Sequence, residues 1–116
     1  MKKIAMLNCD KANAVCTGAS CMAAFLERKA SFSVYKNQQA QLVAFMRCNG
    51  CDSEPTTDAG IVEKVERLKA IGTQIVHIGV CTVRPDTGRE CPTISKIAEM
   101  IEERGIAVVR GTHAVR

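Results

Sequence analysis

Seven cysteines in a chain of 116 residues are the side chains best suited to chemistry. They are Cys9, Cys16, Cys21, Cys48, Cys51, Cys81 and Cys91. An odd number of cysteines cannot close into a complete set of disulfides within one chain. In an intracellular protein, many cysteines indicate metal binding or thiol redox chemistry more often than structural disulfides.

Two of the cysteines form a Cys-x-x-Cys motif in the segment Cys48-Asn49-Gly50-Cys51. Two intervening residues let both sulfurs face one metal ion or each other, so the motif alone fits zinc, an iron–sulfur cluster or a dithiol redox pair. Residues 52–58 separate the motif from the next expected helix. Redox pairs of this kind usually stand at a helix N-terminus, where the helix dipole favours the thiolate. The spacing therefore favours metal binding over dithiol redox chemistry.

The two histidines of the chain have different surroundings. His113 follows Gly111-Thr112 after the last apolar run, so it is a candidate imidazole ligand, with an ordinary solvated histidine as the alternative. His77 lies inside an apolar run, which predicts a buried, hydrogen-bonded structural histidine or an outer partner of a metal ligand. Arg84 and Arg89 lie between Cys81 and Cys91 and are either solvated loop residues or cations that offset several thiolates.

The elements that must position these side chains follow from the apolar pattern. Continuous apolar runs predict buried strands over residues 4–7, 42–46, 74–79 and 106–109. Helical spacing of apolar residues predicts helices over 21–29, 60–71 and 92–104. Asp58 is positioned to cap the second helix, and Pro92 stands at the first position of the third.

Strands that alternate with helices predict a single α/β domain over residues 1–116, built as a three-layer parallel sheet of flavodoxin-like or Rossmann-like type. The sheet has four strands, or five if the apolar residues of segment 31–41 form an edge strand. Every cysteine follows a predicted strand or lies in a strand-to-helix connection, and His113 follows the last strand. We therefore expect all eight residues at the carboxyl edge, where open α/β sheets bind ligands.

This placement predicts a set of metal ligands. The primary candidates are Cys9, Cys48, Cys51, Cys81, Cys91 and His113, and the secondary candidates are Cys16, Cys21 and His77. One zinc ion takes four ligands, so two sites or an iron–sulfur cluster stay open. The alternative is that the cysteines act as small buried hydrophobic residues, for which Cys21 is the best individual candidate.

Composition excludes several other classes of protein. Hydrophobic residues make up 47% of the chain and charged residues 24%, the balance of an ordinary globular protein. No apolar run approaches the ~20 residues that span a membrane, and the N-terminal apolar stretch is too short for a signal peptide. The chain has no Trp and a net charge of +4 from scattered basic residues, which disfavours nucleic-acid binding. We expect a cytoplasmic protein whose partner is a metal ion, not nucleic acid or a membrane.

As a set, these residues resemble the CGGC domain, a small prokaryotic domain named for a central Cys-Gly-Gly-Cys. The resemblance covers essentially the whole chain. It rests on Cys9, on Cys16 with Cys21, on residues 42–45 leading to Cys48 and Cys51, on His77 with Cys81, on Cys91-Pro92, and on Gly111-Thr112-His113. It implies metal binding, with zinc as the expected metal, and no established reaction. Asn49 replaces the first central glycine, and Thr93 stands where that family often has histidine.

Two other functions stay open. In the first, Cys48 and Cys51 cycle between dithiol and disulfide in a cytosolic thiol–disulfide oxidoreductase. In the second, the crevice of the sheet holds a small molecule or an electron-transfer group. That function needs a glycine loop to cradle phosphate, and Gly18 alone is a poor basis for one.

Overall fold

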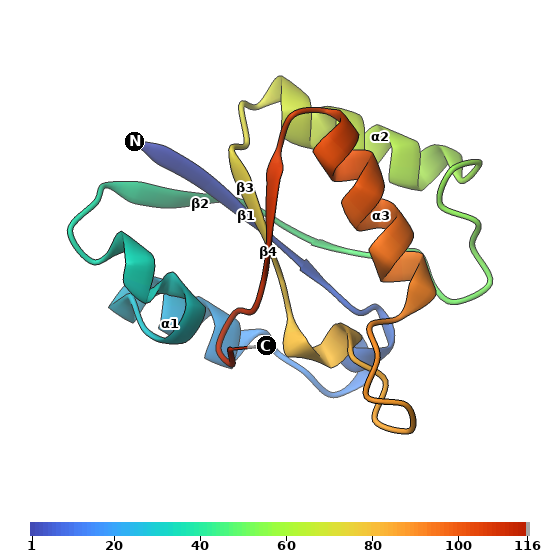
Figure 1. The fold of residues 1–116 in the computed structure, drawn as a ribbon, viewed down its shortest axis with the longest axis horizontal. Helices are drawn as coiled ribbons and strands as arrows, with labels where there is room; N and C mark the ends of the chain where they lie inside the picture. The colour runs from blue at the N-terminus through green and yellow to red at the C-terminus, as the bar shows by residue number, and fades with distance from the viewer. Residues whose placement is uncertain (116) are drawn as a thin grey trace.

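A four-stranded parallel sheet forms the centre of the computed structural model, which describes residues 1–115 (Figure 1). The strands are β1 (Lys2–Asn8), β2 (Ala40–Arg47), β3 (Ile75–Ile78) and β4 (Ala107–Arg110). Their order in the sheet is β2-β1-β3-β4, and every neighbouring pair is parallel. The α/β architecture expected from the alternation of elements is confirmed.

Within residues 1–115, three α-helices and three short 3-10 helices connect the strands. They are η1 (Lys11–Ala14), α1 (Ala19–Glu27), η2 (Ala30–Tyr35), α2 (Ala59–Ala70), η3 (Val80–Thr82) and α3 (Pro92–Glu103). Asp58 caps α2 as predicted, because its carboxylate accepts the backbone N–H groups of Gly60 at 2.8 Å and Ile61 at 3.1 Å. Pro92 is the first residue of α3, where its missing N–H group is not needed.

Residues 30–35 form a 3-10 helix and not the fifth edge strand that their apolar side chains allowed. Arg28 and Ala30 have φ angles of 56° and 50°, in the left-handed region, and these turn the chain between α1 and the 3-10 helix. In a 3-10 helix, residues three positions apart share a face. Phe32 and Tyr35 have this spacing, and both rings are buried against the sheet.

Two apolar cores lie on opposite faces of the sheet. Figure 1 shows α2 and α3 on one side of the sheet and α1 on the other. Successive side chains of a strand point to opposite faces. Ala5 and Leu7 of β1 therefore pack with α2 and α3, whereas Ile4 and Met6 pack with α1 and η2. Packing on both faces holds the central strands in place. Polar side chains that could do chemistry therefore lie in the connections at the carboxyl ends of the strands. Within residues 1–115, no helix is both long enough and apolar enough to cross a membrane.

Candidate metal centre

The carboxyl edge of the sheet carries all seven cysteines and His113. Each lies in a loop after a strand or in the first turn of the helix that follows, as the topology predicts. The structure assigns all seven cysteines as free thiols. They do not form one cluster, however, because the loops direct them toward two neighbouring hollows and into the core.

Four thiols and one imidazole line a cavity of about 30 Å³ at this edge. They belong to Cys9, Cys16, Cys21, Cys81 and His113. These residues come from separate parts of the chain: the connection from β1 to α1, the start of α1, η3 after β3, and the end of β4. The volume suits a single ion or water molecule, and the donors are the sulfur and nitrogen atoms that zinc prefers.

Two of these donors, the thiol of Cys21 and the imidazole of His113, are in direct contact. The Sγ atom of Cys21 lies 3.3 Å from Nδ1 of His113 and 3.2 Å from the hydroxyl of Thr112. Two donors of one tetrahedral zinc ion are separated by about 3.6 Å, from metal–ligand distances of about 2.3 Å and 2.0 Å. The Cys21–His113 separation is therefore compatible with a shared ion.

The environment of Cys81 opposes a thiolate when no cation is present. Its Sγ accepts the backbone N–H of Cys9 at 3.3 Å and lies 3.6 Å from the amide oxygen of Asn8. Partial burial of the thiol raises the pKa of Cys81, although the residue as a whole is exposed. The N–H of Cys9 lowers it, and the nearby thiols of Cys9, Cys21 and Cys16 raise it again. These thiols thus disfavour negative charge on one another, which a metal ion would relieve.

Arg47 adds a positive charge to the wall of this cavity. Its Nε atom is buried and has no hydrogen-bond partner within the described residues. Its guanidinium group lies over the Phe45 ring, with Cζ 5.1 Å from the ring centroid. A buried donor without a partner beside four thiols fits an anionic occupant such as a metal–thiolate centre.

The segment that carries His113 is held by a buried histidine. Nδ1–H of His77 donates to the carbonyl of Gly111 at 2.9 Å, so its Nε2 accepts the hydroxyl of Tyr35 at 2.7 Å. Burial lowers the pKa of His77, although the bond to Gly111 opposes the shift. Gly111 has a φ angle of 133°, which glycine tolerates and other residues rarely adopt. His77 is therefore buried and hydrogen-bonded, and its bond to Gly111 holds the segment that carries His113.

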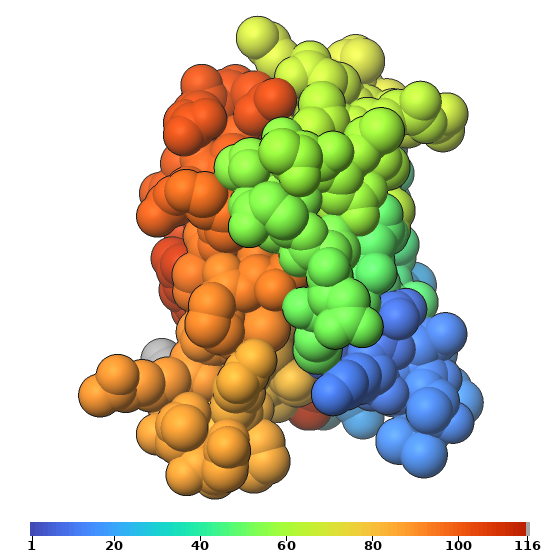
Figure 2. All heavy atoms as spheres, turned by 90° about the vertical axis from the view of Figure 1, so that its right-hand side faces the viewer, coloured from blue at the N-terminus to red at the C-terminus, as the bar shows by residue number. Residues whose placement is uncertain are grey.

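A larger cleft of about 550 Å³ lies beside the small cavity. The thiols of Cys51 and Cys91 face this cleft together with those of Cys9 and Cys81. In Figure 2 this cleft is the hollow between the connection that follows β1, in blue, and the loop before α3, in gold and orange.

Cys91 stands immediately before α3, at the helix N-terminus. Burial would raise the pKa of its thiol. The backbone N–H groups of Ile94 and Thr93 and the side chains of Arg84 and Thr93 outweigh that effect, so the pKa lies below its usual value. Cys91 is therefore the thiol in the cleft whose surroundings favour the thiolate.

Cys48 lines neither hollow. Its side chain is 6% exposed and packs in the core beneath α2 and α3, where Sγ accepts the backbone N–H of Asp10 at 3.4 Å. The structure thus brings together Cys9, Cys81 and His113 of the primary set with the secondary candidates Cys16 and Cys21, and it places Cys51 and Cys91 in the adjoining cleft. Within residues 1–115, no three Cys, His, Asp or Glu side chains are already positioned to hold a metal ion.

Sequence reasoning did not single out Arg47 or Asn8 as parts of the site. Both end strands, at the same edge as the cysteines, so the topological rule that located the thiols also applies to them. Comparison with curated proteins and with solved structures finds no match. The family model of the CGGC domain matches residues 3–113. The chain therefore belongs to the CGGC domain family.

Proposed function

We propose that this protein binds a metal ion at the carboxyl edge of its sheet and that the ion is zinc. Four of the five donors around the small cavity would hold it, drawn from Cys9, Cys16, Cys21, Cys81 and His113. The observation that carries the proposal is that these donors, from separate segments of the chain, line one ion-sized cavity. Membership of the CGGC domain family supports a general role in metal binding.

Two features favour a single zinc ion over an iron–sulfur cluster. The donor set mixes sulfur with the imidazole nitrogen of His113, which suits zinc, whereas most clusters are held by cysteine alone. The cavity of about 30 Å³ matches one ion and not a group of several iron and sulfide ions. Bound zinc with four protein ligands would cross-link the loops that supply them, while three ligands would leave an open position for chemistry.

The surrounding residues support a negatively charged centre. Four thiolates with one zinc ion carry a charge of about −2, and three thiolates with an imidazole about −1. Arg47 supplies an opposing charge at the wall, and its unpartnered Nε is available to donate to a ligand sulfur. The chain's own part in the proposed function is to gather thiolates, balance their charge and exclude water from one side.

Metal analysis of protein purified without oxygen tests the proposal, with Cys81→Ser and Cys48→Ser as a matched pair. We expect colourless protein with about one zinc per chain, loss of zinc in Cys81→Ser and retention of zinc in Cys48→Ser. A brown, iron-containing protein would indicate a cluster. Retention of zinc in Cys81→Ser with its loss in Cys48→Ser would instead assign the metal to the Cys48–Cys51 motif.

The alternative function, thiol–disulfide exchange by Cys48 and Cys51, has less geometric support. Cys48 is buried in the core, and neither residue stands at a helix N-terminus, since α2 begins at Ala59. Free thiols at the metal site require a reducing compartment, for which we propose the cytoplasm. Disulfide reductase activity that survives a chelator and disappears in Cys51→Ser would favour the alternative.

A further inference from the structure

We propose that the metal enters and leaves the small cavity through the larger cleft, where Cys91 and Cys51 first accept it from an anionic thiolate complex. The inference rests on the proposed metal site and extends it from holding a metal to exchanging it with a carrier. Metal is cargo in this role. The chemical class of the partner is a metal ion already bound by thiolates, not a free hydrated ion.

The two hollows adjoin through shared thiols. Cys9 and Cys81 line both the cleft and the cavity, as does Ala12. Cys51 and Cys91 line only the cleft, whereas the remaining donors line only the cavity. The thiols therefore form a series that leads from the open cleft, past two thiols at its boundary, to the pair of Cys21 and His113.

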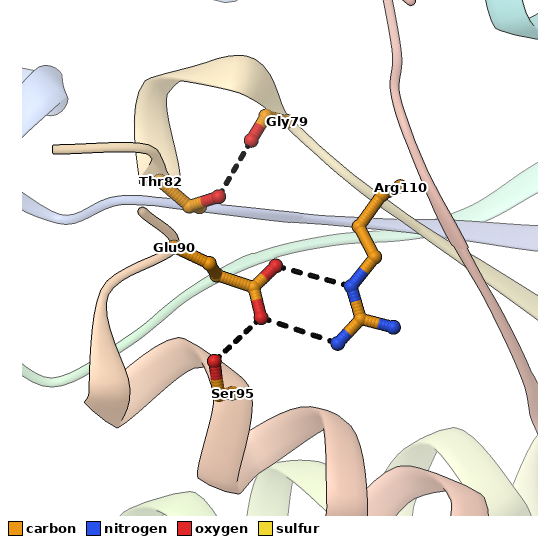
Figure 3. A network of polar contacts seen from close by, with 5 residues as sticks. All are labelled: Gly79, Thr82, Glu90, Ser95 and Arg110. Atoms are coloured by element: carbon orange, nitrogen blue, oxygen red, sulfur yellow. Dashed lines mark hydrogen bonds and ion pairs between the residues drawn. The ribbon is translucent and has the colours of Figure 1, made fainter. Parts of the chain in front are cut away.

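The wall that carries Cys91 is fixed by polar contacts (Figure 3). The carboxylate of Glu90 accepts two bonds from the Arg110 guanidinium, at 3.2 and 3.1 Å, and one from the Ser95 hydroxyl at 2.6 Å. The backbone N–H of Cys91 donates to the carbonyl of Thr82 at 2.8 Å. Cys91, which is 9% exposed, is thus held at a constant place on the cleft wall.

The charged side chains that line the cleft determine which form of the metal can approach it. Lys11 and Arg84 line it against a single carboxylate, that of Asp86. The two cations offset the charges of Asp86 and of the Cys91 thiolate, so the cleft does not repel an anionic complex of the metal with thiolates. Arg84 also favours the thiolate of Cys91. The cleft therefore places cations for the anionic complex beside a thiolate that can enter its coordination sphere.

Transfer is an exchange of thiolates without a change of oxidation state. The Cys91 thiolate forms a sulfur–metal bond as one donor thiolate leaves, and that donor takes up a proton from solvent. Cys81 or Cys9 then loses its proton to solvent, binds the metal and displaces Cys91. No electrons are transferred, so the step needs no oxidant or reductant, and its reversal delivers the metal to an acceptor.

The test measures the rate of zinc uptake from the zinc complex of glutathione by the full-length apoprotein. Variants Cys51→Ser, Cys91→Ser and Arg84→Glu alter residues that line the cleft and do not line the cavity. Arg89→Glu is the matched control because Arg89 is an exposed residue of the same loop and does not line the cleft. We expect Arg84→Glu and Cys91→Ser to slow uptake by roughly tenfold, Cys51→Ser by less, and Arg89→Glu to match wild type. Final zinc content stays unchanged in all four.

Three results would overturn the inference. Wild-type uptake rates in Cys51→Ser, Cys91→Ser and Arg84→Glu, with normal zinc content, would exclude the cleft as the route while leaving the metal site intact. Lower final zinc content in Cys51→Ser and Cys91→Ser would make them resident ligands. A wild-type protein that binds no zinc would contradict the metal site itself and the route with it. Cys51 and Arg84 are exposed, so their variants keep the test valid if Cys91→Ser fails to fold.

Discussion

The thiol of Cys21 lies 3.3 Å from Nδ1 of His113, although 92 positions separate the two residues in the chain. Cys21 belongs to the first turn of α1, and His113 follows β4. The helix begins and the strand ends at the same edge of a parallel sheet, so two distant segments meet there. This contact joins the two kinds of donor that the proposed zinc site requires.

Replacement of His113 with alanine tests that contact. We expect zinc affinity to fall by more than roughly 100-fold, because loss of a direct ligand exceeds the 10- to 100-fold effect of losing an outer partner. Competition with a chromophoric chelator measures the affinity, and X-ray absorption of the zinc-loaded wild type should show one nitrogen ligand among sulfurs. A zinc shell of sulfur alone would exclude His113.

Arg47 is expected to contribute through its charge. Arg47→Gln should weaken zinc binding by roughly tenfold, and Arg47→Lys by less, because a cation beside several thiolates offsets their negative charge. Arg67→Gln serves as the control, since Arg67 lies exposed on α2 in an ion pair with Glu63. Equal zinc affinities in Arg47→Gln and Arg67→Gln would mean that the charge of Arg47 does not affect metal binding.

Zinc affinity should rise with pH. The pKa of Cys81 lies above its ordinary value of 9.0, so the thiol is protonated at neutral pH, and zinc must displace the proton. Each thiol that loses a proton on binding steepens the dependence by up to about tenfold in affinity per pH unit. Calorimetric titration in buffers of different ionisation enthalpy counts the released protons. Cys48→Ser, which keeps all the proposed ligands, should release as many protons as wild type.

Stability without metal should fall as the pH drops below 6.5, the ordinary pKa of histidine. The folded-state pKa of His77 is lowered, so below 6.5 the unfolded chain binds more protons than the folded chain, and protonation favours unfolding. The slope from one proton is at most about 1.4 kcal/mol per pH unit. Urea unfolding between pH 5 and 8 measures it. The slope should vanish in His77→Asn and persist in His113→Ala, which removes the other histidine.

Gly79 is required by the side chain of Asn8. A Cβ atom at residue 79 would collide with the amide oxygen of Asn8, which is 5% exposed and cannot move into solvent. We expect Gly79→Ala to destabilise the fold by about 1–3 kcal/mol. A second change, Asn8→Ala, removes the obstacle, so the double variant should be more stable than the sum of single effects predicts. Additive losses in chemical denaturation would show that the two residues do not interact.

The sequence predicts the fold well because its strands are continuous apolar runs. The run over residues 4–7 marks the centre of β1, and Pro92 marks the first residue of α3, so topology and the cysteine-bearing edge follow directly. The conformation of residues 30–35 is harder to predict from the sequence, because Phe32 and Tyr35 have the spacing of a 3-10 helix but are also residue types typical of a strand.

Which cysteines share a cavity was not predictable from spacing. Cys48 and Cys51 are close in sequence, yet one packs in the core and the other is exposed in the cleft. Side chains that are close in sequence point in different directions when the chain bends between them. Cys21 and His113 meet only because side-chain direction and loop path, which no local pattern encodes, bring them together.

The amino edge of the sheet carries none of the candidate donors. Its turns, over residues 36–39, 71–74 and 104–106, contain neither cysteine nor histidine. Asn37 lies exposed in the first of these turns. A fluorophore or a surface tether attached at Asn37 would therefore hold the molecule by the edge opposite its thiols and leave the cysteine-bearing edge facing the surrounding solution.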